Sequence, residues 1–190
     1  YKSSRFPGKP LADIFGKPMI EYVYRQAARA ALVERVIIAT DDSRIFNSAA
    51  AFGAEVVMTP QDCPTGTDRI AHVARNERWE IVVNVQGDEP TIEPESIDRA
   101  IRPLLEDASL LMSTIKCQIL DPGTLEDPNA VKVVTDPEGY ALYFSRSPIP
   151  YRAAPTAGST AGLALPPGTF FKHIGLYVYR RSFLLEFASM

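Results

Sequence analysis

Residues 81–90 read IVVNVQGDEP, and this stretch decides the fold class of the chain. Four of the six residues from Ile81 to Gln86 are Ile or Val, as is typical of a buried β-strand. The strand leads directly into a turn that carries Gly87 and Asp88. Because ligands of open α/β sheets bind at the carboxyl ends of the strands, Asp88 is predicted to face a binding crevice.

Strands and helices alternate on both sides of this stretch. The apolar run 36–40 is a second buried strand, and Asp42 and Ser43 follow it as a loop and helix N-cap. The helix that they begin is predicted to run to about Phe52 and to end at Gly53. Further predicted elements are a short strand at 55–58 and helices at 18–31, 67–76 and 94–105. This alternation predicts a parallel, layered α/β sheet.

The pattern changes after about Leu110. Strand-like runs dominate there, with few helical signals between them, at 111–118, 131–135, 141–144 and 170–179. This part predicts an antiparallel extension of the sheet or a small lobe. Residues 153–168 are rich in Ala, Pro, Gly, Ser and Thr, which indicates a flexible surface loop.

The bulk properties limit the classes of partner. A chain of 190 residues with 46% hydrophobic residues suits one domain with a real core, and we assign residues 1–190 to a single domain. A formal net charge of -3 gives no general attraction to nucleic acid or to anionic lipid, so any recognition of phosphate must be local. No apolar run has the length of a membrane span and no signal peptide is visible, which predicts a cytoplasmic protein without membrane insertion.

The cysteines and the chain ends indicate a fragment of a cytosolic protein. Cys63 and Cys117 have neither a CxxC partner nor a neighbouring His, which predicts two free thiols in a reducing compartment. The chain opens without a Met inside a loop of functional appearance, and it stops at residues 186–190 within a helix-like run. We therefore expect a piece of a longer protein, incomplete at both ends.

The string SSRFPGKPL at 3–11 is the first candidate for chemistry. Arg5 and Lys9 place two fixed positive charges in a turn. Gly8 lets the backbone approach a ligand closely, and Ser4 is a further candidate to contact it. Cations and backbone N–H groups lower the repulsion between a triphosphate and an attacking nucleophile. Two cations alone would equally suit a solvated loop, but the whole string is far more specific and predicts that Arg5 and Lys9 are catalytic.

Asp88 is the candidate metal ligand. Mg²⁺ prefers hard oxygen ligands and is usually held by one or two carboxylates together with phosphate oxygens. The position of Asp88 after a buried strand suits this role, whereas an ordinary turn carboxylate is the simpler alternative. Glu89 precedes Pro90, where it could equally shape the turn. The sequence therefore predicts a magnesium site with Asp88 as its ligand.

Two further groups are candidates for binding the rest of a nucleotide and an acidic sugar. The first combines hydroxyls, a flexible glycine and a cation at the start of a helix, and comprises Thr65, Gly66, Thr67 and Arg69. Taken alone, a TGT string is more often a simple helix N-cap. The second offers a cation, an imidazole and a phenol on strands, and comprises Arg146, His173 and Tyr177. Such groups suit an anionic polyol, although any one of them alone is more often core or surface.

Seven segments occur in the order of a known family. They are SSRFPGKPL (3–11), ATDD (39–42), TGTDR (65–69), NVQGDEP (84–90), PNAVK (128–132), ALYFSR (141–146) and HIGLY (173–177). Together they extend over essentially the whole chain, which resembles the 3-deoxy-manno-octulosonate (Kdo) cytidylyltransferases, also called CMP-Kdo synthetases. The match is specific, well beyond that of a generic sugar nucleotidyltransferase.

The resemblance implies both a fold and a reaction. The fold is a Rossmann-like, three-layer nucleotide-diphospho-sugar transferase fold, with a mixed, mainly parallel sheet and an antiparallel extension. The reaction joins CTP and Kdo to give CMP-Kdo and pyrophosphate, for lipopolysaccharide biosynthesis. The resemblance also implies Mg²⁺ as cofactor, bound by Asp88, and a homodimer.

The resemblance also implies roles for the candidate residues. Arg5 and Lys9 would hold the triphosphate, and Lys9 would neutralise charge at the α-phosphate. The residues implied around the nucleotide are Ser4, Thr65, Gly66, Thr67, Arg69 and Gln86. The residues implied to contact the sugar are Gln86, Arg146, His173 and Tyr177. The anomeric hydroxyl would attack the α-phosphorus in line, without an obvious side chain as general base.

Two departures from the family pattern and three alternatives stay open. The family's first strand and its C-terminal part, which supplies a second metal-binding Asp, are absent here, so we expect the isolated fragment to be poorly active. A cytidylyltransferase for another acidic sugar, such as sialic acid, would carry the same phosphate and metal motifs. A non-catalytic nucleotide-binding module is a different class, against which the retained cations and carboxylate argue. A glycosyltransferase would carry a DxD-type metal motif, which residues 88–90 are not.

Overall fold

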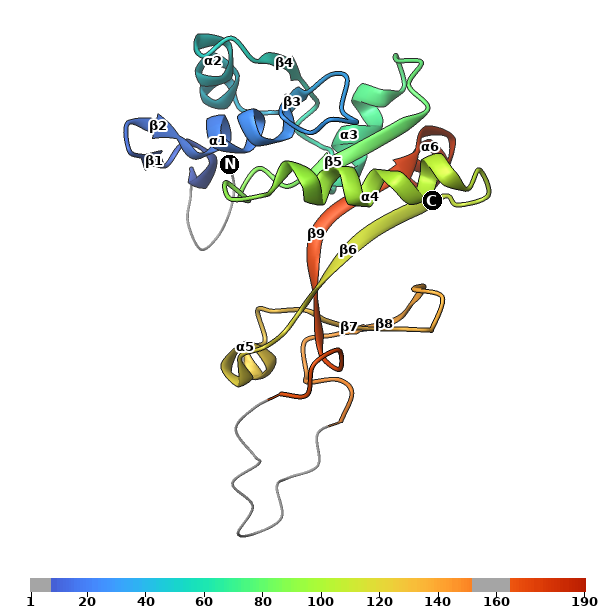
Figure 1. Ribbon diagram of the computed structural model, residues 1–190. Helices are drawn as coiled ribbons and strands as arrows, with labels where there is room; N and C mark the ends of the chain where they lie inside the picture. The colour runs from blue at the N-terminus through green and yellow to red at the C-terminus, as the bar shows by residue number, and fades with distance from the viewer. Residues whose placement is uncertain (1–7, 152–164) are drawn as a thin grey trace, which may run out of the picture. The chain divides into compact units, whose positions relative to one another are not determined.

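A computed structural model describes residues 8–151 and 165–190 of the chain (Figure 1). The predicted ligands Ser4 and Arg5, and most of the predicted loop 153–168, lie outside these residues. The chain divides into two compact units, one of residues 1–113 with 176–190 and one of residues 114–175. The assignment of residues 1–190 to a single domain stays a prediction.

The first unit contains most of the helices. Its elements in chain order are η1 (Lys9–Leu11), β1 (Asp13–Ile14), β2 (Lys17–Pro18), α1 (Met19–Ala27), β3 (Ile37–Thr40), α2 (Ser43–Ala51), β4 (Glu55–Met58), α3 (Gly66–Ala74), β5 (Ile81–Val85), α4 (Pro94–Glu106) and α6 (Arg181–Phe187). Two strands, β6 (Met112–Gln118) and β9 (Phe171–Arg180), begin in one unit and end in the other. The predicted elements of this part are present with bounds within two residues, except that the helix expected at 18–31 ends at Ala27. The η1 turn, the β1–β2 hairpin and the bounds of α6 were not predicted.

Local signals account for the bounds of α2. The carboxylate of Asp42 accepts a hydrogen bond from the backbone N–H of Arg44 at 2.9 Å, so Asp42 is the N-cap that the sequence predicts. At the other end, Gly53 has a φ of 80°, a left-handed conformation that residues with a Cβ rarely adopt. The helix therefore begins and ends where cap chemistry allows it.

Within the described residues, the strands belong to three separate sheets: β1 with β2, β3 with β4, and a five-stranded sheet in which β5 pairs with β9, β9 also pairs with β6 and β7 (Lys132–Thr135), and β7 pairs with β8 (Ala141–Ser145). β3 and β4 pair in parallel, with Ile37 opposite Glu55. β5 instead pairs antiparallel with β9, with Val85 opposite Leu176. The expectation of one mainly parallel sheet is therefore wrong for the described residues, whose strand pairs are mostly antiparallel.

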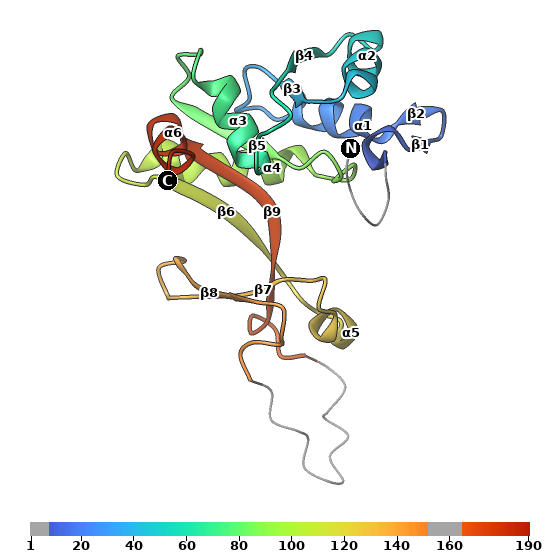
Figure 2. The ribbon, with the colours of Figure 1, turned by 180° about the vertical axis from the view of Figure 1, so that it is seen from behind.

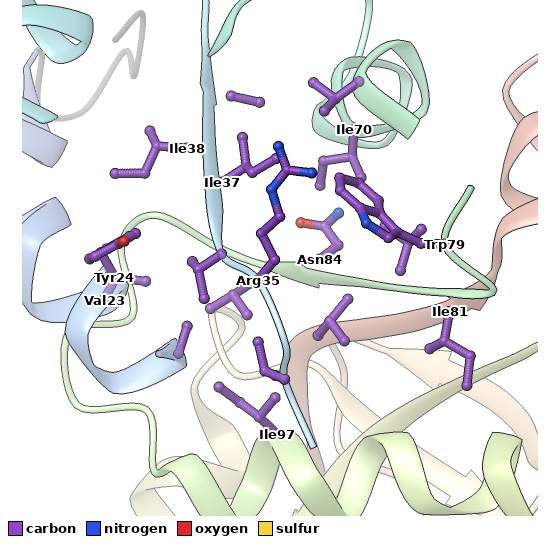
Figure 3. Close-up of a pocket in the computed structure, with 18 of the residues that line it drawn as sticks. Val23, Tyr24, Arg35, Ile37, Ile38, Ile70, Trp79, Ile81, Asn84 and Ile97 are labelled. Carbon is purple, nitrogen blue, oxygen red and sulfur yellow. The ribbon is translucent and has the colours of Figure 1, made fainter. Parts of the chain in front are cut away.

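A cavity lies between β3 and β5, where a continuous sheet would require their pairing or an intervening strand. It has a volume of about 540 Å³, and residues 36–39 and 81–85 line it from the two strands (Figure 3). Apolar side chains of three helices form much of the remaining wall, namely Ile20, Val23, Ile70, Val73, Ile97 and Ile101. Across this space the two strands form no ladder, which requires a spacing of about 4.8 Å between neighbouring strands.

Two apolar clusters hold the helices against the strand pairs. The cluster on the β3–β4 pair comprises Ile20, Ile38, Ile45, Ala49 and Ala54. The cluster on the β5–β9 pair comprises Ala71, Ala74, Val82, Tyr179 and Leu184, and brings α3 and α6 together. Burying a single Leu or Ile side chain contributes about 1.5–3 kcal/mol, so these clusters are the main source of stability of the first unit.

The second unit is built on an antiparallel hairpin (Figure 2). β7 (Lys132–Thr135) and β8 (Ala141–Ser145) pair with Val133 opposite Phe144. The turn between them contains Gly139, whose φ of 97° favours glycine. This hairpin pairs antiparallel with β9 and agrees with the antiparallel extension of the sheet or small lobe that the sequence predicts after about Leu110.

A small core supports the hairpin. Ile119, Leu125, Leu165 and Phe170 are buried together, and the backbone N–H of Ile119 donates to the carbonyl of Phe170 at 2.8 Å. Leu125 belongs to α5 (Pro122–Glu126), a short helix that was not predicted from the sequence. Its N-cap is Asp121, which accepts from the backbone N–H of Thr124 at 2.9 Å. Over residues 8–151 and 165–190, no helix combines the length and the apolar character needed to cross a membrane.

Candidate active site

Lys9 and Asp88 lie in contact in the first unit. The ammonium Nζ of Lys9 is 2.8 Å from Oδ2 of Asp88, although the residues are 79 positions apart in the chain. Both side chains are partly exposed, Lys9 to 35% and Asp88 to 47%. The cation predicted for the triphosphate and the carboxylate predicted for the metal therefore occupy one place at the surface of the unit.

Backbone geometry on both sides holds this pair. Gly8, immediately before η1, has a φ of 76°, so the chain turns sharply just before Lys9. On the other side, a Cβ at Gly87 would approach Cδ1 of Ile20 to 3.2 Å. The glycine thus lets the turn after β5 pack closely on α1, and the N–H of Glu89 closes this turn by donating to the carbonyl of Gln86 at 3.3 Å.

The donor set at Asp88 suits one type of metal site. Within the described ranges, no group of three or more His, Cys, Asp and Glu side chains could cage a metal ion. A single carboxylate is nevertheless a common arrangement for Mg²⁺, which takes its other ligands from substrate phosphates and water. Asp88 thus fits Mg²⁺ that arrives with a nucleotide, and it does not fit a permanently bound structural ion.

The hydroxyls of the TGT segment have partners within the first unit. Thr65 is the N-cap of α3, and it forms a capping box with Asp68, whose backbone N–H donates to the Thr65 hydroxyl at 3.2 Å. The side chain of Thr67 neighbours the phenol of Tyr179, whose pKa is raised by burial and lowered to a smaller extent by Thr67. Gly66 is the first residue of α3, at the end of the helix where backbone N–H groups point outward.

Arg69 joins two loops to α3. Its guanidinium donates to the hydroxyl of Thr59 and to the carbonyl of Pro60, the latter at 3.3 Å, and it lies 3.3 Å from the carboxylate of Asp41. These partners follow β4 and β3, and the Arg69 side chain is only 17% exposed. The structure therefore gives this cation a role in positioning the loops.

Three of the predicted nucleotide residues border the cavity described above. Gly66, Arg69 and Gln86 line it, together with Gly87. Figure 3 shows that much of the rest of the lining is apolar, with Ile37 and Ile38 of β3 and Ile81 of β5 around the space. Asn84 also points its amide into this region, while Arg35 lies over the ring of Trp79 at 5.3 Å from its centroid.

The predicted sugar residues of the second unit have clear neighbours. The guanidinium of Arg146 donates to the carbonyl of Pro128 at 2.8 Å and is otherwise exposed. His173 is half-buried, with its Nε2 at 2.8 Å from the hydroxyl of Thr114 and its ring edge-on to Phe144 at 5.1 Å. Burial lowers the pKa of His173 below its ordinary value, which favours the neutral imidazole.

Tyr177 belongs to the first unit. It lies opposite Asn84 in the β5–β9 pair, and its ring stacks on that of Tyr179 with centroids 6.2 Å apart. Tyr177 therefore lies next to β5, the strand that leads to Asp88. Of the predicted site residues in this unit, the structure brings Lys9 and Asp88 into direct contact and places Gly66, Arg69 and Gln86 around one cavity.

Two polar residues of the second unit were missed by the sequence reasoning. Thr114 contacts His173, and no motif marks it, since a threonine within a strand is usual. Lys132 is fully buried, and its ammonium donates to the carbonyl of Asp127 at 2.9 Å. The unusual combination of a lysine within the apolar run AVKVV was a usable signal for Lys132.

The fold defines an α/β nucleotidyltransferase. A solved CMP:2-keto-3-deoxy-manno-octonic acid synthetase in complex with CTP superposes with a TM-score of 0.85 at 41% identity, over 100% of this chain and 74% of its own. A solved cytidylyltransferase from Leptospira borgpetersenii serovar Hardjo-bovis has a TM-score of 0.58 over 99% of this chain and 60% of its own. Its identity of 13% shows a shared fold alone.

The sequence comparisons identify the family. The model of the family described as cytidylyltransferase matches residues 1–190. The 3-deoxy-manno-octulosonate cytidylyltransferase of Geobacter sulfurreducens is 54% identical over 191 residues, which cover 100% of this chain and 76% of the relative. That of Solibacter usitatus is 48% identical over 190 residues, with 100% and 72% covered. The chain belongs to the 3-deoxy-manno-octulosonate cytidylyltransferase family, and it spans about three-quarters of the length of these relatives.

Proposed function

We propose that the protein transfers the cytidylyl group of CTP to Kdo and releases pyrophosphate, which supplies CMP-Kdo for lipopolysaccharide biosynthesis. Membership of the family supports the reaction. At the level of residues, the observation that carries the proposal is the contact of 2.8 Å between Lys9 and Asp88. A cation for phosphate and a carboxylate for Mg²⁺ meet there, as transfer of a nucleotidyl group requires.

The ion pair can exchange partners when the substrate arrives. A triphosphate oxygen competes with Asp88 for the ammonium of Lys9, which then faces the charge that develops at the α-phosphorus. In the reaction, the anomeric oxygen of the sugar bonds to this phosphorus while the bond to the pyrophosphate oxygen breaks. Lys9 would stabilise the negative charge on the α-phosphate oxygens throughout, and Arg5 is the predicted second cation.

Asp88 would hold Mg²⁺ through a carboxylate oxygen. When bound, the ion supplies neutralisation of phosphate charge and lowers the pKa of a coordinated hydroxyl. Asp88 would therefore pair with Lys9 before the nucleotide binds and with Mg²⁺ afterwards. The exposure of its side chain, 47%, leaves the carboxylate accessible for this exchange.

The start of α3 is the proposed contact of the nucleotide with the first unit. The first backbone N–H groups of a helix have no intrahelical acceptor, and they favour negatively charged or polar groups. Gly66 and Thr67 would therefore act through the backbone, since the hydroxyls of Thr65 and Thr67 have internal partners. Gln86 and Ser4 remain proposed nucleotide ligands, and Arg69 would act by holding the loops around them.

The sugar would be recognised by Gln86, Arg146, His173 and Tyr177, as the resemblance implies. Arg146 suits the sugar carboxylate, because a guanidinium forms strong, charge-assisted hydrogen bonds with carboxylates. His173 and Tyr177 suit hydroxyls, to which an imidazole nitrogen and a phenol can bond.

A cytoplasmic homodimer is also proposed. The side chains of Leu142, Tyr143 and Phe144 in β8 are 67%, 63% and 42% exposed, and β8 lies at the edge of its sheet. Two copies of such an edge, joined antiparallel about a two-fold axis, would pair its free backbone groups and bring these side chains next to those of the second copy. Sedimentation of the natural full-length protein should show a dimer that Tyr143→Lys dissociates and Phe15→Lys, at an exposed aromatic of the first unit, does not. A Tyr143→Lys protein that stays dimeric would contradict this surface.

The reaction is tested by pyrophosphate release from CTP and Mg²⁺ by the natural full-length protein. Kdo and sialic acid are offered in parallel, and release with Kdo alone is the expected result. Release with sialic acid would reassign the substrate. Binding of CTP without release in the presence of either sugar would favour a non-catalytic nucleotide-binding module.

A further inference from the structure

Lys132 is a fully buried cation of the second unit, in the central strand β7 of its sheet. Moving an ammonium group from water into a protein interior costs several kcal/mol, so an apolar side chain would suit this position better. A second lysine, Lys172, lies opposite Lys132 in β9, and like charges at opposite positions of paired strands are destabilising. Packing therefore does not explain why a lysine stands here, and its contacts have to.

The ammonium of Lys132 is attached to the turn 127–130. Its Nζ donates to the carbonyl of Asp127 at 2.9 Å, and the same carbonyl accepts the backbone N–H of Ala130 at 3.1 Å, which closes the turn. The carboxylate of Asp127 accepts from the backbone N–H of Asn129 at 2.8 Å. Asp in the first position and Pro in the second favour such a turn. The turn thus has a defined shape, and Lys132 fastens it to β7.

Arg146 reaches the same turn from the neighbouring strand. It follows β8 directly, and its guanidinium donates to the carbonyl of Pro128 at 2.8 Å. Ser145, the residue before it, lies opposite Lys132 in the β7–β8 pair. The two cations therefore hold adjacent carbonyls of one turn, that of Asp127 from β7 and that of Pro128 from β8. Of these two cations, Arg146 is exposed and Lys132 is buried, so only the guanidinium is accessible to a ligand.

We propose that Lys132 is a positioning residue that fixes the turn 127–130 and, through this turn, orients the guanidinium of Arg146 toward the carboxylate of the sugar. This assignment rests on the proposed function, and it makes the role of Arg146 more specific. A guanidinium is a rigid, planar fork of N–H donors, so one hydrogen bond to Pro128 restricts the direction of the others. A turn that moved freely would lose the paired geometry with which such a fork binds a carboxylate.

Kinetics of the natural full-length protein test this coupling. Lys132→Met keeps a long apolar stem and removes the charge, and it should raise the KM for Kdo by about five- to tenfold, the effect of weakening one charge-assisted hydrogen bond. The KM for CTP should be unchanged. Arg146→Met should raise the KM for Kdo at least as much, and adding Lys132→Met to Arg146→Met should raise it no further, because Lys132 acts through Arg146. An additive rise in the double variant would overturn the proposal.

Lys116→Met is the matched control. Lys116 belongs to β6 of the same sheet, and its ammonium donates to the hydroxyl of Thr135 at 2.6 Å and lies over the ring of Phe171 at 4.4 Å from its centroid. The substitution therefore also removes a lysine with a hydrogen bond to the sheet, without touching the turn 127–130. We expect it to leave the KM for Kdo unchanged.

Nuclear magnetic resonance gives a readout that does not depend on the folding of a variant at Lys132. In the unmodified full-length protein, the order parameter of the Arg146 Nε–H should lie well above about 0.6, the upper limit for flexible groups. Asp127→Ala, which loosens the turn from its exposed side, should lower this order parameter and raise the KM for Kdo. An Arg146 guanidinium that is already mobile in the unmodified protein would overturn the proposal.

The two proposals fail in different ways. If the unmodified protein releases no pyrophosphate with Kdo, the proposed function fails, while the order parameter still decides whether the turn holds Arg146. If the protein is active with Kdo and Lys132→Met has an unchanged KM for Kdo, the role of Lys132 is refuted and the proposed function stands.

Discussion

Two pairs of polar side chains, Lys9 with Asp88 and Thr114 with His173, differ in their exposure and in the backbone that carries them. Lys9 and Asp88 are partly exposed and stand on turns, whereas Thr114 and His173 are half-buried and stand on paired strands. An exposed ion pair contributes about 0–1 kcal/mol, so exchanging its partners for a ligand is easy. A hydrogen bond between half-buried groups is more costly to break. The exposed Lys9–Asp88 pair therefore suits a site where charge changes during a reaction. The half-buried Thr114–His173 pair suits recognition by side chains that stay in place.

Removal of Lys9 is the strongest test of this contrast. We expect Lys9→Ala to lower kcat by about 10²–10³-fold, as for the loss of one group that stabilises transition-state charge, with little change in the KM for Kdo. The control is Lys17→Ala, which removes a partly exposed lysine that pairs with Glu21 at 3.6 Å on the same unit. A raised KM for CTP with unchanged kcat would assign Lys9 to ground-state binding.

Asp88→Asn tests the other half of the exposed pair. The substitution keeps the shape and removes the charge, so we expect about tenfold or more Mg²⁺ for half-maximal activity, since carboxylates are the preferred protein ligands. The activity is measured across a Mg²⁺ titration at saturating CTP. Asp62→Asn, in an exposed loop of the same unit, should leave the titration unchanged. An unaltered Mg²⁺ requirement in Asp88→Asn would remove Asp88 from the metal site.

Thr65→Ala separates structure from recognition at α3. Because the hydroxyl belongs to a capping box, we expect the free energy of unfolding to fall by about 1 kcal/mol. The KM for CTP should change by no more than about twofold if the nucleotide contacts the backbone. Urea unfolding and steady-state kinetics on the same samples measure the two effects. A large rise in this KM with unchanged stability would show that the hydroxyl binds the nucleotide.

Acid titration compares helix caps of the two units. A side-chain hydrogen bond from Arg44 lowers the pKa of Asp42, and the backbone N–H of Thr124 lowers that of Asp121. A carboxyl group with a depressed folded-state pKa stabilises the fold above its unfolded pKa, about 4, and this stabilisation is lost as the pH falls through the folded-state pKa. Asp42→Asn and Asp121→Asn should each make stability less dependent on pH below about 4.

The measurement is the urea midpoint at a series of pH values. We expect the smaller change for Asp121→Asn, because within the described residues this carboxylate is stabilised by hydrogen bonds from Thr124 and Gly123 and not by a cation. Variant and unmodified proteins whose midpoints fall in parallel with decreasing pH would contradict the role of these caps.

The local elements were predictable because their causes lie within a few residues. The strand 55–58 has the bounds that the apolar pattern predicts, and α2 begins at its Asp42 cap. The expected single sheet failed for a non-local reason, since β3 pairs with β4 and β5 pairs with β9, so that a cavity lies between β3 and β5. Strand propensity in each segment cannot show which edges meet.

The sequence predicted which residues are candidates for the site, but it did not predict the contacts that these residues make. Thr67 and Arg69 were chosen for their chemistry, yet the structure directs them to Tyr179, Asp41, Thr59 and Pro60. Those partners lie on other elements, so no spacing within residues 64–69 could reveal them. Thr114 was missed for the same reason, since His173 is 59 positions away.

The sequence by itself determined the four helices α1 to α4 and most strands, the cap at Asp42, the candidate cations and carboxylate, and the family through motifs in order. Only the tertiary structure decided that Lys9 meets Asp88, that β3 and β5 stay apart, and that Thr114 contacts His173. The physical reason is the separation along the chain over which each interaction acts. Capping, turn preference and hydrophobic periodicity act between near neighbours in the chain, whereas these contacts depend on how distant strands pair and pack.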